Sequence, residues 1–338
     1  MNKKRVLAML LAGAMALSMT ACGGNSASTD GSSNDGGASA SGGSYKVSVI
    51  LKTLAAEYWQ YVKSGAEDYA SEHSDKVTVE VKGPSSETAF DEMQNMIETD
   101  LSSGSYDGVI ISPLQSDPAA QLVSGTKLPI VAIDTNFTAP EVKSFVGTGN
   151  EAAAKKGGEA AVEAAKAAGW TDIKCIEIAG VQGDQTNTAR MNGYKAGVEE
   201  AGGTFLSDEV QYADATADRA TTAMEAIMQT HPEGIAIICA NNDDMAMAAA
   251  RAAQGHDAYK NTIFLGFNGD RAACEAILAG QMTMSVAQMA YEMGYKAVET
   301  MVQVLDGETV DEFVDSGSDV VTPDNAQERL DTLKTQLH

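Results

Sequence analysis

The chain has 338 residues, of which 47 are acidic and 23 are basic, so its formal net charge is -24. This balance repels phosphate backbones and anionic membrane surfaces, and it argues against nucleic-acid binding. With 44% apolar residues the chain can bury a core, which excludes intrinsic disorder for most of its length. The length favours two domains over one.

Residues 1–21 are typical of a signal peptide. Basic residues at Lys3 to Arg5 precede an apolar run, Val6 to Leu17, that is too short to span a bilayer permanently. Met19 to Cys22 resembles a bacterial lipoprotein processing box, with Met19 in the place of the more usual Leu. The resemblance implies cleavage before Cys22, a lipid on its thiol, and an extracytoplasmic position on the bacterial cell membrane. An ordinary secreted protein is the alternative.

Residues 22–44 are predicted to form a linker behind the lipidated cysteine. Gly and Ser supply 14 of the 22 residues from 23 to 44, a composition that cannot bury a core. The remaining cysteines, Cys175, Cys239 and Cys274, lie in apolar segments without a C-x-x-C pair, so we expect buried free thiols.

Two series of strands and helices follow. The first has predicted strands at 47–51, 77–81, 108–112 and 129–133 and helices at 56–72 and 89–102. The second has strands at 173–179, 204–211, 234–239 and 263–267, a further short run at 284–287, and helices at 151–168, 188–200, 217–230, 243–254 and 270–279. Strands that alternate with helices predict an α/β fold with parallel, doubly wound sheets. Two similar series predict two similar lobes, which a helix at 291–305 and a strand and helix within 320–333 complete.

Polar side chains follow several of the predicted strands, at the edge where open parallel sheets bind ligands. They are Lys52, Asp134, Asn241, Asn242, Asp243, Asn268 and Gln288. Asp and Asn at such junctions are also typical helix caps or turn formers, but this alternative does not account for the Lys and the Gln.

Tyr58 and Trp59 are about 100° apart on the first predicted helix, so one can pack inward while the other, or the edges of both, line a cleft. Aromatic faces beside amide and carboxylate groups suit a sugar, whereas an ordinary amphipathic helix is the alternative.

The enzyme motifs are weak. Gly147 to Ala152 fits G-x-G-x-x-A, but no acidic residue ends the next strand, as dinucleotide binding requires. The glycine-containing loop after Gly180 lacks the lysine of a phosphate loop, and the four histidines are scattered without metal-ligand spacing. There is no G-x-S-x-G elbow. The sequence therefore predicts binding without catalysis, cofactor or metal.

Five segments resemble the substrate-binding proteins of bacterial sugar ABC transporters, in the ribose-, allose- and galactose-binding class. They are residues 49–59, 83–88, 238–247, 265–269 and 280–288, within a similarity that covers about 45–335 and looks closest to the allose-binding branch. The resemblance implies a type I periplasmic binding protein, whose two lobes are joined by a three-segment hinge near 147–150, 285–289 and 312–318. We expect one lobe at 45–148 plus about 286–313 and the other at about 149–285 plus 314–338.

The resemblance also implies the sugar contacts. Carried over by position, they fall on Lys52, Tyr58, Trp59, Asp134, Arg190 or Asn192, Asn242, Asn268 and Gln288, with Asn241 and Asn242 ambiguous by one residue. Ala56 stands where the family usually has an Asn, Asn268 replaces an Asp, and an aromatic residue common near Ala217 is missing. These departures favour a neutral monosaccharide, or a polyol or deoxy relative, other than ribose.

The implied function is capture of this ligand by hinge closure in a monomeric, lipid-anchored protein, followed by delivery to the permease of an ABC transporter. A module that presents a sugar-like or signalling molecule to a sensor kinase or chemoreceptor is the alternative. A cytoplasmic repressor of the same fold is disfavoured, because no pair of DNA-binding helices precedes Val47 and the anchor places the protein outside the cytoplasm.

Overall fold

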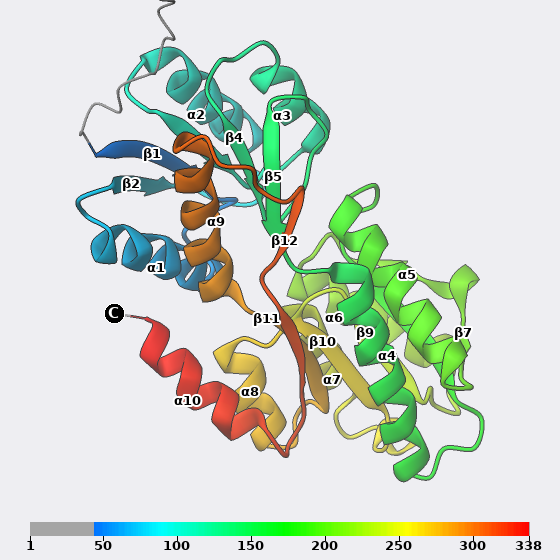
Figure 1. Ribbon diagram of the computed structural model, residues 1–338. Coiled ribbons are helices and arrows are strands. Elements are labelled where there is room, and N and C mark those ends of the chain that lie inside the picture. The colour runs from blue at the N-terminus through cyan, green and yellow to red at the C-terminus, as the bar shows by residue number, and fades with distance from the viewer. Residues whose placement is uncertain (1–43, 338) are drawn as a thin grey trace, which may run out of the picture. The chain divides into compact units, whose positions relative to one another are not determined.

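The strands of residues 44–337, the part of the chain that this computed structural model describes, form two separate β-sheets (Figure 1). The predicted signal peptide, Cys22 and the linker up to residue 43 lie outside the described residues. We refer to each sheet with its covering helices as a lobe. The predicted α/β class with two lobes of mainly parallel strands is confirmed. Within residues 44–337, no helix is long and apolar enough to cross a membrane.

The N-terminal lobe has six parallel strands in the order β12-β5-β4-β3-β1-β2. They are β1 (Tyr45–Ile50), β2 (Val77–Lys82), β3 (Gly108–Ile111), β4 (Ile130–Ile133), β5 (Val142–Gly147) and β12 (Phe313–Asp315). The helices are α1 (Glu57–Glu72), α2 (Phe90–Ser103), α3 (Ser116–Val123) and α9 (Ala290–Leu305). Since side chains alternate along a strand, Val47 and Val49 pack with α1 and α9, whereas Ile50 packs with α2 and α3.

The C-terminal lobe has seven strands, in the order β13-β11-β10-β9-β6-β7 with β8 beside β6. They are β6 (Lys174–Ala179), β7 (Thr204–Phe205), β8 (Gln211–Tyr212), β9 (Ile237–Ala240), β10 (Ile263–Asn268), β11 (Met284–Gln288) and β13 (Ser318–Val321). Only the pairing of β13 with β11 is antiparallel within the described chain.

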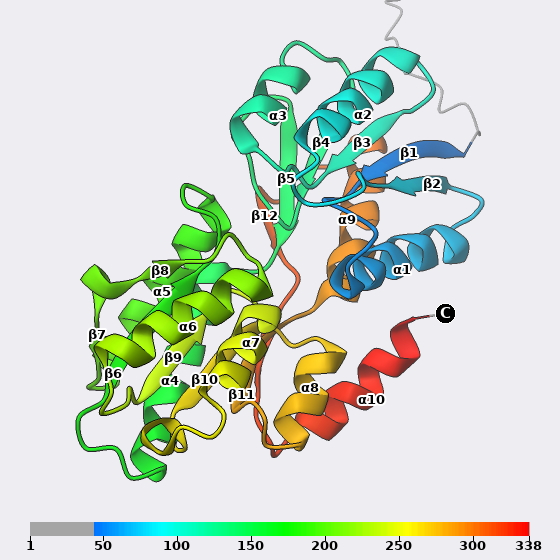
Figure 2. The ribbon, with the colours of Figure 1, turned by 180° about the vertical axis from the view of Figure 1, so that it is seen from behind.

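Helices cover both faces of this second sheet. They are α4 (Asn150–Ala167), α5 (Gln185–Glu200), α6 (Ala217–Thr230), α7 (Asp243–Ala253), α8 (Arg271–Leu278) and α10 (Ala326–Gln336), with short 3-10 helices at Ser207–Glu209 and Asp257–Tyr259. The core below α4 and α5 includes Cys175, Leu265 and Phe267. Figure 2 shows α6 and α7 on the opposite face, and α8 beside α10.

Three segments run between the sheets. One joins β5 to α4 at residues 147–150, the second joins β11 to α9 at 288–290, and the third joins β12 to β13 at 315–318. The first and third are adjacent, because the Thr148 and Ser316 hydroxyl oxygens lie 3.4 Å apart. These segments are where one lobe can rotate against the other.

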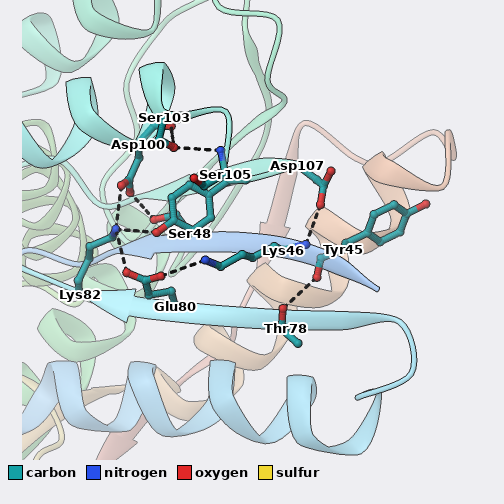
Figure 3. Close-up of polar contacts among 11 residues, drawn as sticks. Tyr45, Lys46, Ser48, Thr78, Glu80, Lys82, Asp100, Ser103, Ser105 and Asp107 are labelled. Carbon is teal, nitrogen blue, oxygen red and sulfur yellow. Dashed lines mark hydrogen bonds and ion pairs between the residues drawn. The ribbon is translucent and has the colours of Figure 1, made fainter. Parts of the chain in front are cut away.

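A polar network ties the edge of the N-terminal sheet to α2 (Figure 3). The buried Asp100 carboxylate accepts from Ser48 Oγ at 2.5 Å and from Lys82 Nζ at 2.8 Å. Lys46 and Lys82 both lie over the Tyr106 ring, with their Nζ atoms 4.8 and 5.0 Å from its centroid. The Asp100 carboxylate of α2 therefore holds β1 through a hydrogen bond and β2 through an ion pair.

Some predicted elements differ from the structure. The strand expected at 204–211 is divided into β7, a 3-10 turn and β8, because Asp208 and Glu209 interrupt the apolar pattern. The strands β5 and β12 and the helix α3 were not predicted. Cys175, Cys239 and Cys274 are buried and free, as expected.

Candidate functional site

The polar residues expected at strand ends lie at those ends in both sheets. Lys52 follows β1 and Asp134 follows β4 in the N-terminal lobe. In the C-terminal lobe, Asn242 follows β9, while Asn268 and Gln288 are the last residues of β10 and β11. Since parallel strands end at one edge, each lobe carries its polar groups on the edge where ligands bind in such sheets.

In the N-terminal lobe, the buried Asp134 carboxylate has two hydrogen-bond donors and one ion-pair partner. Tyr58 Oη donates to its Oδ1 at 2.8 Å, and Thr135 Oγ1 donates to its Oδ2 at 2.9 Å. Lys52 Nζ lies 3.8 Å from the same Oδ2. Burial, and then the charge and hydrogen bond of Asp134, raise the pKa of Tyr58 well above its usual value, so the phenol stays a donor. Asp134 has φ 62°, a conformation that costs free energy in a non-glycine residue.

The adjacent aromatic residues near the start of α1 are both buried, at 7% exposure for Tyr58 and 3% for Trp59. Their rings meet edge to face, with centroids 5.0 Å apart. Trp59 Nε1 donates to Glu87 Oε1 at 2.8 Å, which ties the ring to the loop after β2. The two rings thus share one buried site through their edge-to-face contact, and the expectation that one ring or the edges of both line a cleft stays a prediction.

In the C-terminal lobe, Arg190 is held at the strand ends by neutral partners. Its Nε donates to Asn150 Oδ1 and its Nη1 donates to the Asn241 carbonyl, both at 2.8 Å. The guanidinium lies 3.8 Å from the centroid of the Phe267 ring. Asn192, its alternative in the sequence prediction, is exposed, because residues two apart on a helix point about 200° apart. The structure thus turns Arg190, and not Asn192, toward the strand ends.

The two adjacent asparagines after β9 have different environments. Asn242 caps α7, since its Oδ1 accepts from Met245 N at 2.9 Å and its Nδ2 donates to the Ala215 carbonyl at 3.1 Å. Asn241 is buried, with its Nδ2 3.4 Å from Glu177 Oε1. The contact of Asn242 with Met245 N is therefore that of a helix cap, as the alternative interpretation of the sequence expected.

Gln288 and Asn268 are joined side chain to side chain. Gln288 Nε2 donates to Asn268 Oδ1 at 2.9 Å, and Asn268 Nδ2 donates to Asp270 Oδ2 at 3.3 Å. Arg329 Nη2 donates to the Gln288 carbonyl at 2.7 Å from helix α10. This chain of contacts brings the ends of β10 and β11 into one polar cluster.

Sequence reasoning missed four residues that the structure adds to this edge: Asn150, Glu177, Asp270 and Arg329. Glu177 had a visible signal, because it is an acidic residue within the apolar strand β6. It is fully buried, its Oε2 has no hydrogen-bond partner in the described structure, and burial raises its pKa to about 8. Arg329 had no signal, since its target carbonyls belong to a distant part of the chain.

One ion pair connects the two lobes at the rim of this region. Arg271 Nε, at the start of α8, lies 3.4 Å from Glu57 Oε1 at the start of α1. The same Glu57 oxygen accepts from Tyr61 Oη at 2.9 Å. The carboxylate is therefore oriented within its own lobe before it meets the arginine.

A groove of about 660 Å³ lies elsewhere, between the carboxyl ends of α7 and α8. Its lining includes Arg251, His256 and Lys260, together with Thr262 and Phe264 at the start of β10 and Met282 and Thr283 just before β11. It is therefore at the opposite end of these strands from Asn268 and Gln288, and it contains none of the candidate site residues. Within residues 44–337, no group of three His, Cys, Asp or Glu residues is arranged to hold a metal ion.

Comparisons with known proteins agree with this architecture. A family model described as periplasmic binding protein domain matches residues 47–309. The D-allose-binding periplasmic protein of Escherichia coli (strain K12) is 30% identical over 264 residues, which cover 75% of this chain and 82% of that protein. The ribose import binding protein RbsB of the same organism is 27% identical over 268 residues, with coverage of 78% and 86%.

A solved structure shares the fold. It is an ABC transporter solute binding protein from Agrobacterium vitis with bound D-fucose. Its TM-score is 0.74 at 24% identity, and the match covers 87% of this chain and 100% of that chain.

Proposed function

Because this chain belongs to the periplasmic binding protein domain family, we propose that it is an extracytoplasmic solute-binding protein of an ABC transporter. It captures a monosaccharide or a related polyol between its lobes and delivers it to the membrane permease. The relatives that suggest a sugar are named for D-allose and ribose, and a structural neighbour holds D-fucose.

One observation carries this proposal: each lobe holds a buried polar cluster at the carboxyl ends of its strands. Tyr58, Lys52 and Asp134 supply the first, while Arg190, Asn268 and Gln288 supply the second. Sugar hydroxyls donate and accept hydrogen bonds, so they match clusters that contain carboxylate, amide and guanidinium groups. The apolar C–H faces of a sugar match Tyr58 and Trp59.

The lobes in this proposal follow the expected division into residues 45–148 plus about 286–313 and about 149–285 plus 314–338, with two boundaries moved: β11 keeps the chain in the second lobe to Gln288, and β12 keeps it in the first lobe to Asp315. Rotation about the three connecting segments brings the two clusters onto the ligand and excludes water, which strengthens each hydrogen bond. Binding involves no turnover in this scheme, because the ligand leaves the protein unchanged.

The binding assignments of individual residues are part of the proposal. We assign ligand contacts to Lys52, Tyr58, Trp59, Asp134, Arg190, Asn268 and Gln288. Asn242 acts through the cap that positions α7, and the exposed Asn192 is the weakest candidate of those expected from the sequence.

Calorimetric titration tests the function. D-allose, D-ribose, D-fucose and myo-inositol are titrated in turn, and at least one should bind while the radius of gyration falls in X-ray scattering. A protein that gives no heat with any sugar or polyol of a broad panel would not be a sugar-binding protein. Binding without compaction would contradict hinge closure alone.

The membrane anchor is a separate part of the proposal. Cleavage before Cys22 and lipidation of its thiol tether a monomeric body to the cell membrane. In the producing bacterium, wild-type protein should partition into detergent and Cys22→Ser should be soluble. Equal partition of both would reject the anchor but leave sugar binding intact. Presentation to a sensor kinase or chemoreceptor is not favoured, since the relatives are named for binding and import.

A further inference from the structure

The turn from β10 to α8, residues 268–270, is fixed by hydrogen bonds at its backbone. Gly269 N donates to Ser285 Oγ at 3.0 Å, and Asp270 N donates to Asp243 Oδ2 at 3.0 Å. The Gly269 carbonyl accepts from Arg329 Nε at 3.2 Å. The turn cannot reorient without breaking these bonds, so it presents its side chains in a preset direction.

The backbone of this turn is also strained. Asn268 has φ 138°, and Gly269 has φ 65°. A Cβ atom at Gly269 would lie 2.4 Å from Ala287 Cβ, so the strand β11 allows only glycine there. Strain of this kind persists when the surroundings enforce it, and it concentrates at functional sites.

Asp270 stands at the N-cap position of α8, but its carboxylate does not cap the helix. Its side chain accepts from Asn268 Nδ2 at 3.3 Å and forms no ion pair within the described residues, because the neighbouring Arg271 pairs with Glu57. Asp270 therefore serves neither as the side-chain cap of α8 nor as an ion-pair partner within the described residues.

The turn that carries Asp270 lies beside helix α1 of the other lobe, because the next residue, Arg271, pairs with Glu57 at the start of α1. Burial raises the pKa of Tyr58 and of Tyr61 on this helix, and the negative charge of Asp270 adds to the rise. Asp270 also contacts Asn268, which Gln288 contacts in turn, so its carboxylate is part of the polar cluster of the C-terminal lobe. We propose that Asp270 is a ligand-binding carboxylate, and that it selects a neutral ligand with two adjacent hydroxyl groups. This inference rests on the proposed function.

The charges of the candidate site support the ligand class. Lys52 neutralises Asp134, and Arg271 neutralises Glu57, which leaves Arg190 and Asp270 without an ion-pair partner among the described residues. An anion would be repelled by Asp270 and a cation by Arg190. Two adjacent hydroxyls of a neutral ligand can each donate to one carboxylate oxygen.

Proton release supplies a second signature of direct contact. Burial, and then the charge of Asp243, raise the pKa of Asp270, while Asn268 lowers it. Hydroxyl donors would stabilise the ionised carboxylate and lower its pKa, so the fraction of Asp270 that is protonated in the free protein would lose its proton on binding. The titratable groups that act on Asp270 or respond to it are Asp243, Asp244, Glu57, Tyr58, Tyr61, Cys274 and Arg329.

The test compares Asp270→Asn with Asp244→Asn, which removes a nearby charge from the exposed side of α7. D-allose, D-ribose, D-fucose and myo-inositol are titrated into the wild type and both variants by calorimetry, in buffers of different ionisation enthalpy. Asp270→Asn should bind the panel member that the wild type binds most tightly with about 10- to 100-fold lower affinity, because it has lost a charge-assisted acceptor. Asp244→Asn should stay within about twofold, and proton release should disappear only in Asp270→Asn.

Thermal unfolding of the ligand-free proteins separates a lost contact from a damaged fold. The melting temperature of Asp270→Asn should be equal to or above that of the wild type, because the change removes repulsion from Asp243. Unchanged affinity, or a loss of affinity in Asp244→Asn as large as that in Asp270→Asn, would overturn the role of Asp270 and leave the proposed function intact. If the wild type binds no member of the panel, the sugar function and this inference both fall.

Discussion

At the scale of single residues, the Lys82–Asp100 pair is the buried interaction of the N-terminal lobe that is easiest to isolate. Asp100 is 3% exposed, and its carboxylate has donors in Lys82 and Ser48 (Figure 3). Lys82→Met should lower the free energy of unfolding by about 2–3 kcal/mol, because a buried carboxylate loses its counter-ion. Urea unfolding followed by circular dichroism measures the loss.

The neighbouring Lys46 supplies the matched control. It pairs with Glu80 at 3.5 Å, and both side chains are about half exposed, at 48% and 49%. Lys46→Met also removes a lysine from the Tyr106 ring, but it should cost less than about 1 kcal/mol. Equal losses in the two variants would show that the burial of Asp100 does not determine the strength of its ion pair.

Glu177 should make stability depend on pH. Its pKa in the folded protein is about 8, raised mainly by burial from the usual 4.5. Between these values the folded state holds a proton that the unfolded state has lost, so stability should fall as pH rises, by up to about 1.4 kcal/mol per pH unit. Glu177→Gln should remove this slope and unfold at higher urea than the wild type at pH 9. If the stability of the wild type and of Glu177→Gln changed with pH in the same way, the Glu177 carboxyl group would be ionised throughout this pH range.

The residues that the sequence predicted are those whose place follows from strand order. Lys52, Asp134 and Gln288 could be found because the carboxyl ends of parallel strands share an edge. Asn150 and Arg329 could not, because their contacts join segments that only the folded chain brings together. For Tyr58 and Trp59 of α1, helical spacing describes the direction of each side chain but not the residue that it contacts.

At the scale of elements, α1 and α9 approach each other through a pair of glycines. A Cβ at Gly65 would lie 1.9 Å from the Tyr291 carbonyl oxygen, and one at Gly294 would lie 1.9 Å from the Val62 carbonyl oxygen. Gly294→Ala should therefore lower the free energy of unfolding by about 2 kcal/mol, although alanine favours a helix by about 1 kcal/mol.

Gly149→Ala is the control for this change, since its Cβ would have 3.9 Å to the nearest atom, Asp315 Oδ2. The control should change stability by less than about 1 kcal/mol in the same urea titration. A Gly294→Ala protein as stable as the wild type would mean that the two helices separate without cost.

The predictable elements are those with long, regular patterns. The buried strands of both lobes and the long helices α1, α4 and α9 follow from apolar runs and helical spacing. The strand β12 has three residues and an exposed phenylalanine, so its pattern is too short to detect, and its place depends on pairing with β5. Short elements of this kind are defined by their neighbours and not by their own sequence.

At the scale of the whole molecule, the net charge and the site have separate consequences. The charge of -24 argues against binding to nucleic acid, but it does not describe the ligand. The candidate cleft combines Lys52, Arg190 and Arg271 with Asp134, Asp270 and Glu57, so its formal charge is balanced. The acidic excess must therefore lie on the rest of the chain.

The Arg271–Glu57 ion pair should favour the closed arrangement of the lobes, because it joins α8 to α1 and can form only while they approach each other. Arg271→Gln should weaken binding of the tightest panel sugar by at most about fivefold at low salt, since a partly exposed pair contributes up to about 1 kcal/mol. In 1 M NaCl the wild type and the variant should converge. Calorimetry at two salt concentrations measures both effects, and X-ray scattering follows closure. Arg251→Gln, in the distant groove of the same lobe, is the control and should bind as the wild type does. The same loss in both variants, or a loss that salt does not reduce, would assign the effect to general charge or to packing, and the ion pair would have no part in closure.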